Sequence, residues 1–315
     1  MNTNYSQPLS NSIGRMKKAL FKPFDLSKWI HVGFTAFLSG LTGLTGGSGV
    51  GNPRAGMNGF NWDKFFSFPE SAWLWISSNP FWSVLILTGI LFLLSLAIIL
   101  SWISSRGKFM FLHNVVNNRD EVVKPWHEYR QQGNSFFWWQ FIYTWIVLAV
   151  FVLFLIYSFG IFKHIYYGTI PTASKFGFIF GLIVVFIVLL VITAYISLFL
   201  TDFIVPIMYK HRIPATKAWA KFISLAVNNM GSFIVYGLFI LVLKIAVGIA
   251  VLFLAVMTCC VGLLLIMIPF VGSVILLPVS YSFRAFSIEY FAMFGDEFDL
   301  ISDIESEQHK EKTRF

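Results

Sequence analysis

The chain contains long apolar stretches that carry almost no acid or base, and these decide what it can fold into. Six such stretches cover Trp29–Gly46, Phe81–Ile103, Phe136–Gly160, Phe176–Thr201, Gly231–Met257 and Gly262–Phe283. About 20 helical residues cross a hydrocarbon core, and inside lipid each backbone amide must be satisfied within its own segment, which favours helices. We therefore expect an all-α integral membrane protein with six transmembrane helices. The first, rich in Gly and Thr, is the weakest apolar run.

Composition excludes a soluble domain. Hydrophobic residues make up 57% of the 315 residues and charged residues only 12%, whereas soluble domains are roughly 25% charged. The N-terminal stretch is polar and then basic, without the apolar segment and cleavage site of a signal peptide. We expect the first membrane helix to act as the targeting signal.

Lysine and arginine are distributed unequally between the two sides of the predicted helices. Eighteen of the 23 lie in the N-terminal segment, the loops 104–135 and 202–230 and the C-terminal tail, four lie on the opposite side, and Lys244 lies within the fifth span. The positive-inside rule then makes both termini cytoplasmic. We expect a cytoplasmic N-terminal segment (1–28), a six-span domain (29–290) and a mobile cytoplasmic tail (291–315).

The net charge of +8 would suit a nucleic-acid partner. Its concentration on the cytoplasmic side points instead to the anionic headgroups of the inner leaflet. We expect membrane lipids as partners and no nucleic acid.

A short basic and aromatic element occurs twice. The stretch NNRDEVVKPWHEY covers residues 117–129, and KHRIPATKAWAKF covers residues 210–222. Three residue types coincide at a constant offset of 93: Arg119 with Arg212, Lys124 with Lys217, and Trp126 with Trp219. Each copy follows an even-numbered span. The pattern predicts a tandem helical-pair repeat, in which a span, a basic turn, an interfacial helix and a second span form the unit.

Both copies are typical of helices that lie in the membrane interface. In the second copy Pro214 suits a first helical turn, and helical periodicity separates Trp219 and Phe222 from Lys217 and Lys221. We expect two cytoplasmic interfacial amphipathic helices, with headgroup contacts from Arg119, Lys124, Trp126, Arg212, Lys217, Trp219 and Lys221. They would either attach the bundle to the membrane surface or form a platform for lipid headgroups or a cytoplasmic protein partner.

Lys244 is the most informative single residue, because it lies about 13 residues into the fifth span, roughly 20 Å from the cytoplasmic end. An ionisable group at that depth usually faces a bundle interior or water. The fourth span supplies a polar stripe, namely Thr193, Tyr195, Ser197, Thr201 and Asp202. Together with Lys244 this stripe forms a candidate intramembrane polar site. The alternative is that Lys244 snorkels and the hydroxyl groups bond to carbonyls of the preceding turn.

Two further features leave alternatives open. Pro269, Gly272 and Pro278 interrupt the sixth span, either as simple kinks or as a broken helix that exposes carbonyls at a transport site. Cys259 and Cys260 are adjacent, and fit either two small apolar residues near a helix end or a vicinal redox or metal pair.

Motifs of known chemistry are missing from the sequence. The six histidines are scattered, and there is no H-E-x-x-H, no G-x-S-x-G and no pair of carboxylates within a span. We expect no catalytic residues, no metal site and no cofactor.

Three stretches resemble a family of uncharacterised bacterial multi-pass membrane proteins. They are FKPFDLSKW before the first span, SSRGKFMFLHNVVNNRDEVVKPWHEYRQQGNSFFWW after the second, and YSFRAFSIEYFAMFG at the end. The stretch ATKAWAKFISLAVNNMGSF is similar to the interfacial segment of the membrane domain attached to some glycerophosphodiester phosphodiesterases. The catalytic barrel of those enzymes is not in this sequence, so no activity is carried over. The resemblance implies a bacterial inner-membrane protein with no assigned reaction.

Two classes of function follow from these observations. One is a non-enzymatic structural, partner-binding or lipid-binding membrane protein. The other is a transporter or lipid-handling protein with a polar cavity around Lys244. Access of water to Lys244 would separate them.

Overall fold

Helices make up all the regular structure of the residues that the computed structural model describes, which are 5–44, 62–168, 172–258 and 261–301. In chain order they are α1 (Ser6–Phe21), α2 (Leu26–Leu44), α3 (Trp62–Phe66), α4 (Phe68–Ser78), α5 (Pro80–Asn117), α6 (Val123–Glu128), α7 (Arg130–Tyr166), α8 (Thr172–Phe199), α9 (Val205–His211), α10 (Ala215–Asn228), α11 (Met230–Met257), α12 (Val261–Met267), α13 (Pro269–Ile275) and α14 (Leu277–Ala292). The π-helical turn Leu200–Ile204 joins α8 to α9, and the 3-10 turn Asp296–Phe298 follows α14. The predicted all-α class is confirmed.

Four helices are long and apolar enough to cross a membrane. They are α5, α7, the continuous helix Ser174–His211 and α11. In the most apolar stretch of each helix, between 0% and 11% of the residues are buried inside the protein. Apolar surface of this extent on a soluble protein would be an association site, whereas lipid is its natural solvent here. These apolar helices are therefore compatible with a membrane protein.

The first and sixth predicted spans are not among these four. The first forms α2, a helix of 19 residues. The sixth is divided into α12, α13 and α14, and the first break falls at Ile268, whose extended backbone precedes Pro269. A residue before proline is driven out of the helical region by the proline ring. The structure thus shows four candidate spans, and a count of six stays a prediction.

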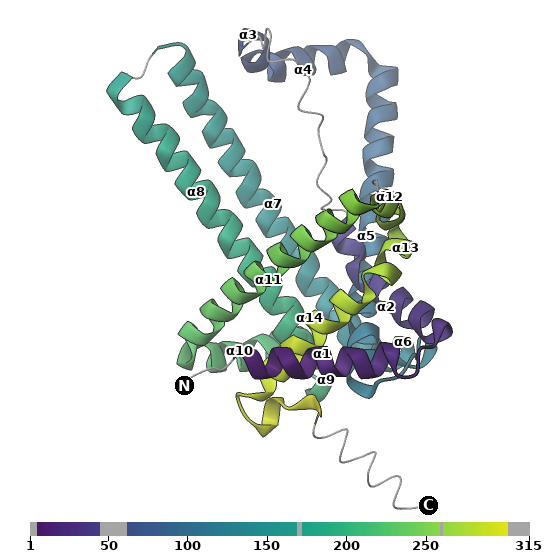
Figure 1. Cartoon of the computed structure of the whole chain (residues 1–315). Helices are drawn as coiled ribbons and strands as arrows, with labels where there is room; N and C mark the ends of the chain where they lie inside the picture. Colours follow the sequence, from purple (N-terminus) through teal and green to yellow (C-terminus); the bar gives the residue numbers. More distant parts are fainter. Residues whose placement is uncertain (1–4, 45–61, 169–171, 259–260, 302–315) are drawn as a thin grey trace, which may run out of the picture.

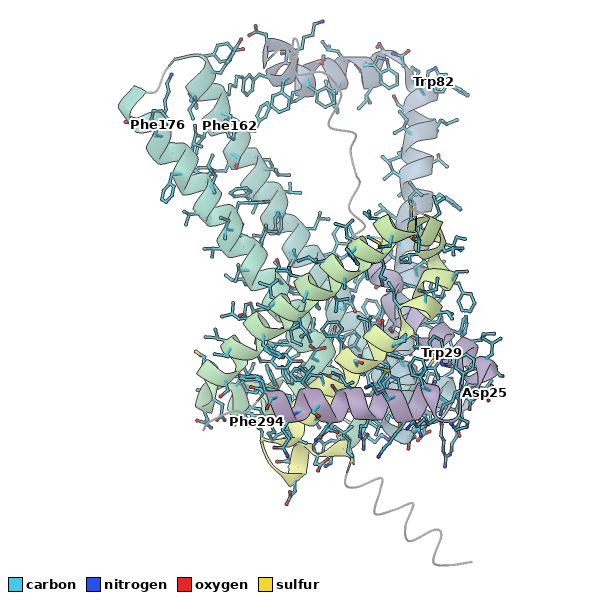
Figure 2. All side chains as sticks on the ribbon, viewed as in Figure 1. Asp25, Trp29, Trp82, Phe162, Phe176 and Phe294 are labelled. Atoms are coloured by element: carbon cyan, nitrogen blue, oxygen red, sulfur yellow. The ribbon has the colours of Figure 1, made fainter. Side chains whose placement is uncertain are left out.

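The molecule has two distinct ends (Figure 1). Helices α3 and α4 lie at one, the α4 end, whereas α1, α6, α9 and α10 lie at the other, the α10 end. Figure 2 marks the α4 end by Trp82, Phe162 and Phe176, and the α10 end by Asp25, Trp29 and Phe294. The helices converge at the α10 end, while α5 diverges from the α7–α8 pair toward the α4 end.

The hydrophobic core lies at the α10 end rather than between the most apolar stretches of the four long helices. Its centre is Phe203, which is fully buried and packs its ring 5.3 Å from that of Phe222, 5.1 Å from Phe233 and 4.9 Å from Tyr236. Aromatic pairs at these separations add to the stability gained from burial. The α10 end is therefore the tightly packed part of the molecule.

Regions assigned to loops and termini are more ordered than the sequence suggested. The predicted loop 104–135 contains the last turns of α5, all of α6 and the first turn of α7. The N-terminal segment 1–28 contains α1, which packs along α14. The tail expected from residue 291 stays packed farther on, since Phe298 and Leu300 are buried. Residues 302–315 and Cys259 and Cys260 lie outside the described part.

The two repeated elements begin alike. Asn118 ends α5 and Arg212 ends α9, and both have a left-handed backbone, with φ of 53° and 56°. Such a residue reverses the chain after a helix. A helix then starts at Val123 in the first copy and at Ala215 in the second. The first of these helices has 6 residues and the second 14, so the two copies share their turn but not their length.

Candidate functional site

Asp202 lies in the one π-helical turn that the described residues contain, in the last third of the helix Ser174–His211. Widened turns of this kind are rare and often occur at functional sites. They change the direction in which side chains leave the helix. Here the turn is buried at Leu200, Phe203 and Ile204, so Asp202 is held at the edge of the aromatic core.

Two neighbouring helices supply partners to this turn. The Tyr236 hydroxyl of α11 donates a hydrogen bond to Asp202 Oδ2 at 2.9 Å. Arg284 of α14 donates from Nη1 to the Thr201 carbonyl at 2.6 Å, and its side chain is buried. The positive charges of Arg284 and Lys244 also act on the Asp202 carboxylate. A buried charge needs such compensation, because removal from water is costly.

The predicted polar stripe is only partly assembled around Lys244. The Thr193 hydroxyl donates to the carbonyls of Leu189 and Leu190, and the Thr201 hydroxyl donates to that of Ser197. These bonds stay within one helix, as the alternative interpretation expects. The Tyr195 hydroxyl instead crosses to α11, where it donates to the Ile234 carbonyl at 2.9 Å. Of the stripe, Asp202 is the residue whose carboxylate feels the charge of Lys244.

Lys244 has an exposed side chain. It lies one turn beyond Ile240 and two beyond Tyr236, on the same strip of α11 that packs toward Asp202. Helical side chains lean toward the N-terminus of their helix, which for α11 is the α10 end. The lysine therefore reaches back toward Asp202, in the manner of a snorkelling residue.

Arg284 and Tyr236 were not found by sequence reasoning. Arg284 directly follows the sixth predicted span and stands among aromatic residues in YSFRAFSIEYF. A lone cation inside an apolar helical pattern is the signal that could have revealed it. Tyr236 gave no signal, because an aromatic residue in an apolar run is ordinary.

Two more buried cations lie on the last turns of α5. Lys108 Nζ donates to Gln140 Oε1 at 3.0 Å and stands 4.7 Å from the centre of the Phe136 ring. Arg106 donates to Asn134 Oδ1 at 3.0 Å and lies between the rings of two tryptophans. Aromatic faces attract cations by electrostatics. These contacts hold α7 against α5 and leave neither cation free to bind headgroups.

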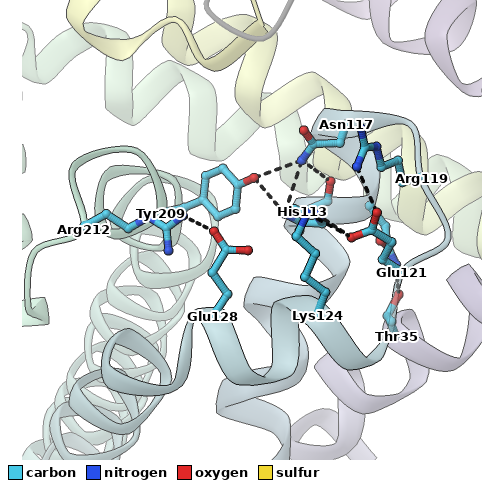
Figure 3. A network of polar contacts seen from close by, with 10 residues as sticks. Thr35, His113, Asn117, Arg119, Glu121, Lys124, Glu128, Tyr209 and Arg212 are labelled. Carbon is cyan, nitrogen blue, oxygen red and sulfur yellow. Dashed lines mark hydrogen bonds and ion pairs between the residues drawn. The ribbon is translucent and has the colours of Figure 1, made fainter. Parts of the chain in front are cut away.

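A second polar cluster joins the two repeated elements (Figure 3). The Tyr209 hydroxyl lies 3.0 Å from His113 Nδ1 and accepts a hydrogen bond from Asn117 Nδ2 at 3.0 Å. The Tyr209 ring stacks on Tyr129 at 4.6 Å, and Arg212 lies over the other copy's Tyr129 ring while pairing with Glu128. The repeated elements therefore bind each other.

The charges in this cluster alter proton binding. Burial alone would raise the pKa of Glu121, but the hydrogen bond from Arg119 and the charge of Lys124 lower it overall. Burial raises the pKa of Tyr129, and the neighbouring Tyr209 raises it further. Glu121 thus stays ionised and Tyr129 stays neutral near pH 7.

The residues predicted to contact headgroups fall into three groups. Four basic side chains are close to acids of the chain: Arg119 and Lys124 to Glu121, Arg212 to Glu128, and Lys221 to Glu297. Trp126 packs on Trp102, and Trp219 stacks on Trp139 at 5.1 Å. Lys217 is exposed. The aromatic faces that were assigned to the membrane interface are thus largely occupied by protein.

Among the described residues no three His, Cys, Asp or Glu side chains come together in a way that could hold a metal ion.

Comparison with known proteins gives a family without an activity. The chain belongs to a family of unknown function, DUF7544, whose profile matches residues 6–295. No curated protein and no solved structure matches the chain. The match is consistent with the resemblance to a family of uncharacterised proteins seen in the sequence, and shows no link to the membrane domain of glycerophosphodiester phosphodiesterases.

Proposed function

We propose that this member of the DUF7544 family is a non-enzymatic integral membrane protein that binds anionic lipid headgroups at its α10 end. That end faces the cytoplasm, and the membrane is the bacterial inner membrane. In this proposal α2 and the α12–α14 region complete the six spans, and the chain arose by tandem duplication of a helical pair. The repeated elements brace each other at the membrane surface, as the stacked Tyr129 and Tyr209 rings suggest.

One observation carries this proposal. Exposed lysines gather at the α10 end on two separate helices: Lys17 and Lys18 on α1, and Lys217 on α10. Among the described contacts no acid side chain pairs with any of these three, whereas Arg15, Arg119, Arg212 and Lys221 at the same end each have an acid partner. Exposed cations beside an anionic leaflet each contribute about 1 kcal/mol of attraction.

Neutralising these lysines should weaken the preference for anionic lipid. We expect the triple variant Lys17→Gln, Lys18→Gln, Lys217→Gln, reconstituted in mixed bilayers, to lose up to about 3 kcal/mol of attraction. Electron paramagnetic resonance with spin-labelled phosphatidylglycerol and phosphatidylcholine measures the ratio of the two lipids at the protein surface. The ratio should fall toward one for the triple variant.

A matched control uses a lysine at the opposite end. Lys163 is exposed in the last turn of α7, near the α4 end. The Lys163→Gln variant should keep the lipid ratio of the native protein. Equal ratios for the native protein and the triple variant would overturn the proposal.

A transport function is the second candidate, and the cluster of Asp202, Tyr236 and Arg284 beside Lys244 favours it. Charged groups within membrane helices are typical of substrate and ion pathways. A cysteine in place of Lys244, with Cys259 and Cys260 replaced by alanine, tests it. A membrane-impermeant thiol reagent should label position 244 if a water-filled pathway reaches it. If lipid covers the residue, as we expect, labelling from both sides should fail, while an Asn228→Cys control at the surface reacts.

A further inference from the structure

An apolar groove lies between α1, α11 and α14. Leu9, Ile13 and Met16 of α1 form one wall, Leu243 and Val247 of α11 form another, and the turn of α14 around Pro278 forms the floor. Ser282 is the single polar side chain of the lining. The groove has a volume of about 300 Å³. This is the lower limit for pockets that hold small molecules, so one hydrocarbon chain suits it better than a whole lipid.

Contacts on the other edge of α1 fix the position of this groove. The face of α1 with Pro8, Ser12 and Ala19 is buried along α14. Arg15 pairs with Glu289 of α14 at 3.2 Å. Residues 278–283 lie farther along α14 from the α10 end than Glu289 does. The groove therefore opens on the bilayer side of α1, while α1 itself lies across the α10 end (Figure 1).

A cation stands beside the groove on the same helix. Lys17 follows Met16 and lies one turn from Ile13, so its Cβ leaves α1 next to the two residues that line the groove. The side chain is exposed. A helix at the headgroup level with an apolar edge and a lysine beside it matches the two parts of a phospholipid, the chain and the phosphate. Water in the groove would find almost no polar partners.

We propose that this groove is a binding site for one anionic phospholipid of the leaflet at the α10 end, with an acyl chain between α1, α11 and α14 and the phosphate on Lys17. The inference rests on the proposed function, since it names the lipid site within it. It differs in kind, because a groove binds one lipid molecule in a fixed place, whereas exposed lysines attract a changing shell.

The groove can be tested by filling it. Val247 lines the groove and Val242 lies on the opposite, exposed side of α11. In native mass spectrometry of protein released from nanodiscs, the native protein and Val242→Trp should retain one bound phosphatidylglycerol. The Val247→Trp variant should lose it, with at least a tenfold drop in occupancy. Equal retention by both tryptophan variants would overturn the site.

A cross-linking measurement on the unaltered protein keeps the test independent of folding. Phosphatidylglycerol with a diazirine in its acyl chain should label Met16 and Leu243 more strongly than the exposed surface of α7 and α8. Uniform labelling, with no excess in the groove, would contradict the proposal. The Lys17→Gln variant should reduce retention of phosphatidylglycerol more than that of phosphatidylcholine, because the choline group of phosphatidylcholine offsets the charge of its phosphate. If retention of both lipids were unchanged, the phosphate contact would be wrong.

The two proposals can fail separately. The Val247→Trp variant keeps every surface lysine, so its preference for anionic lipid in the resonance experiment should match that of the native protein. Loss of the retained lipid with an unchanged surface preference supports both proposals. If the native protein prefers anionic lipid in the resonance experiment but retains no lipid in mass spectrometry, the headgroup proposal stands and the groove is not a lipid site.

Discussion

Replacing Arg284 by methionine should lower the free energy of unfolding by about 3–5 kcal/mol, as expected when one partner of a buried charge pair is removed. The guanidinium donates to the Thr201 carbonyl and balances the charge of Asp202. Without it, Asp202 keeps the hydrogen bond from Tyr236 but loses the buried cation that acts on its carboxylate. Methionine fills most of the volume of the arginine stem, so the loss reports charge and hydrogen bonding rather than a cavity. Denaturant unfolding in detergent micelles, followed by tryptophan fluorescence, measures it.

Two comparisons show whether the effect belongs to the pair. Arg130 is exposed at the start of α7, and Arg130→Met should change stability by no more than about 0.5 kcal/mol. The double variant Arg284→Met, Asp202→Asn should recover part of the loss, because it leaves no uncompensated charge. The single variant Asp202→Asn completes the comparison. If the losses of Arg284→Met and Asp202→Asn simply add in the double variant, Arg284 and Asp202 are not coupled and the cluster is not a unit.

The membrane helices could be predicted because the signal for them is local. Apolar runs such as Phe81–Ile103 identify a lipid-facing helix without reference to any other part of the chain. The last turns of α5 could not be predicted in this way. Arg106 and Lys108 look like loop residues in the sequence. In the helix their charges are stabilised by hydrogen bonds to Asn134 and Gln140 and by contacts with aromatic rings. Tertiary contacts decided the outcome there.

Helix α1 is a different kind of omission. Leu9, Ile13, Met16 and Leu20 recur at spacings of four, three and four residues in the sequence. This is the periodicity of an amphipathic helix, but the surrounding polar and basic residues led to its assignment as an N-terminal segment. Leu9, Ile13 and Met16 line the groove, and Leu20 belongs to the hydrophobic core. A helical spacing of apolar residues therefore predicts a helix here even though basic residues surround it.

The repeated element shows what a sequence pattern can and cannot decide. The offset of 93 correctly drew attention to two similar turns, and Asn118 and Arg212 adopt the same left-handed conformation. The pattern assigned the shared arginines, lysines and tryptophans to the membrane surface. In the structure Arg212 contacts Glu128 and Tyr129 of the other copy. A single sequence shows that two segments are alike, but not that they face each other.

Replacing Gly107 by alanine should destabilise the protein by about 1–3 kcal/mol, the usual cost of forcing extra atoms into a packed interface. A Cβ at Gly107 would lie 2.6 Å from the carbonyl carbon of Leu38 and 2.7 Å from the amide nitrogen of Ser39. Both atoms belong to the backbone of α2, so relief requires α2 and α5 to separate. Separation would also break the hydrogen bond that Ser104 Oγ donates to the Ser39 carbonyl at 3.0 Å.

Gly89 provides the matched control, because it lies in the same helix and a Cβ there would meet no atom within 4 Å. Alanine at Gly89 should be neutral or should stabilise α5 by about 0.5–1 kcal/mol, the intrinsic preference of a helix for alanine over glycine. Opposite signs at the two positions, measured by the same unfolding experiment, would show that backbone contact holds α2 against α5. Small residues permit such close approach between membrane helices. Equal effects at the two positions would instead show that this backbone contact does not hold α2 against α5.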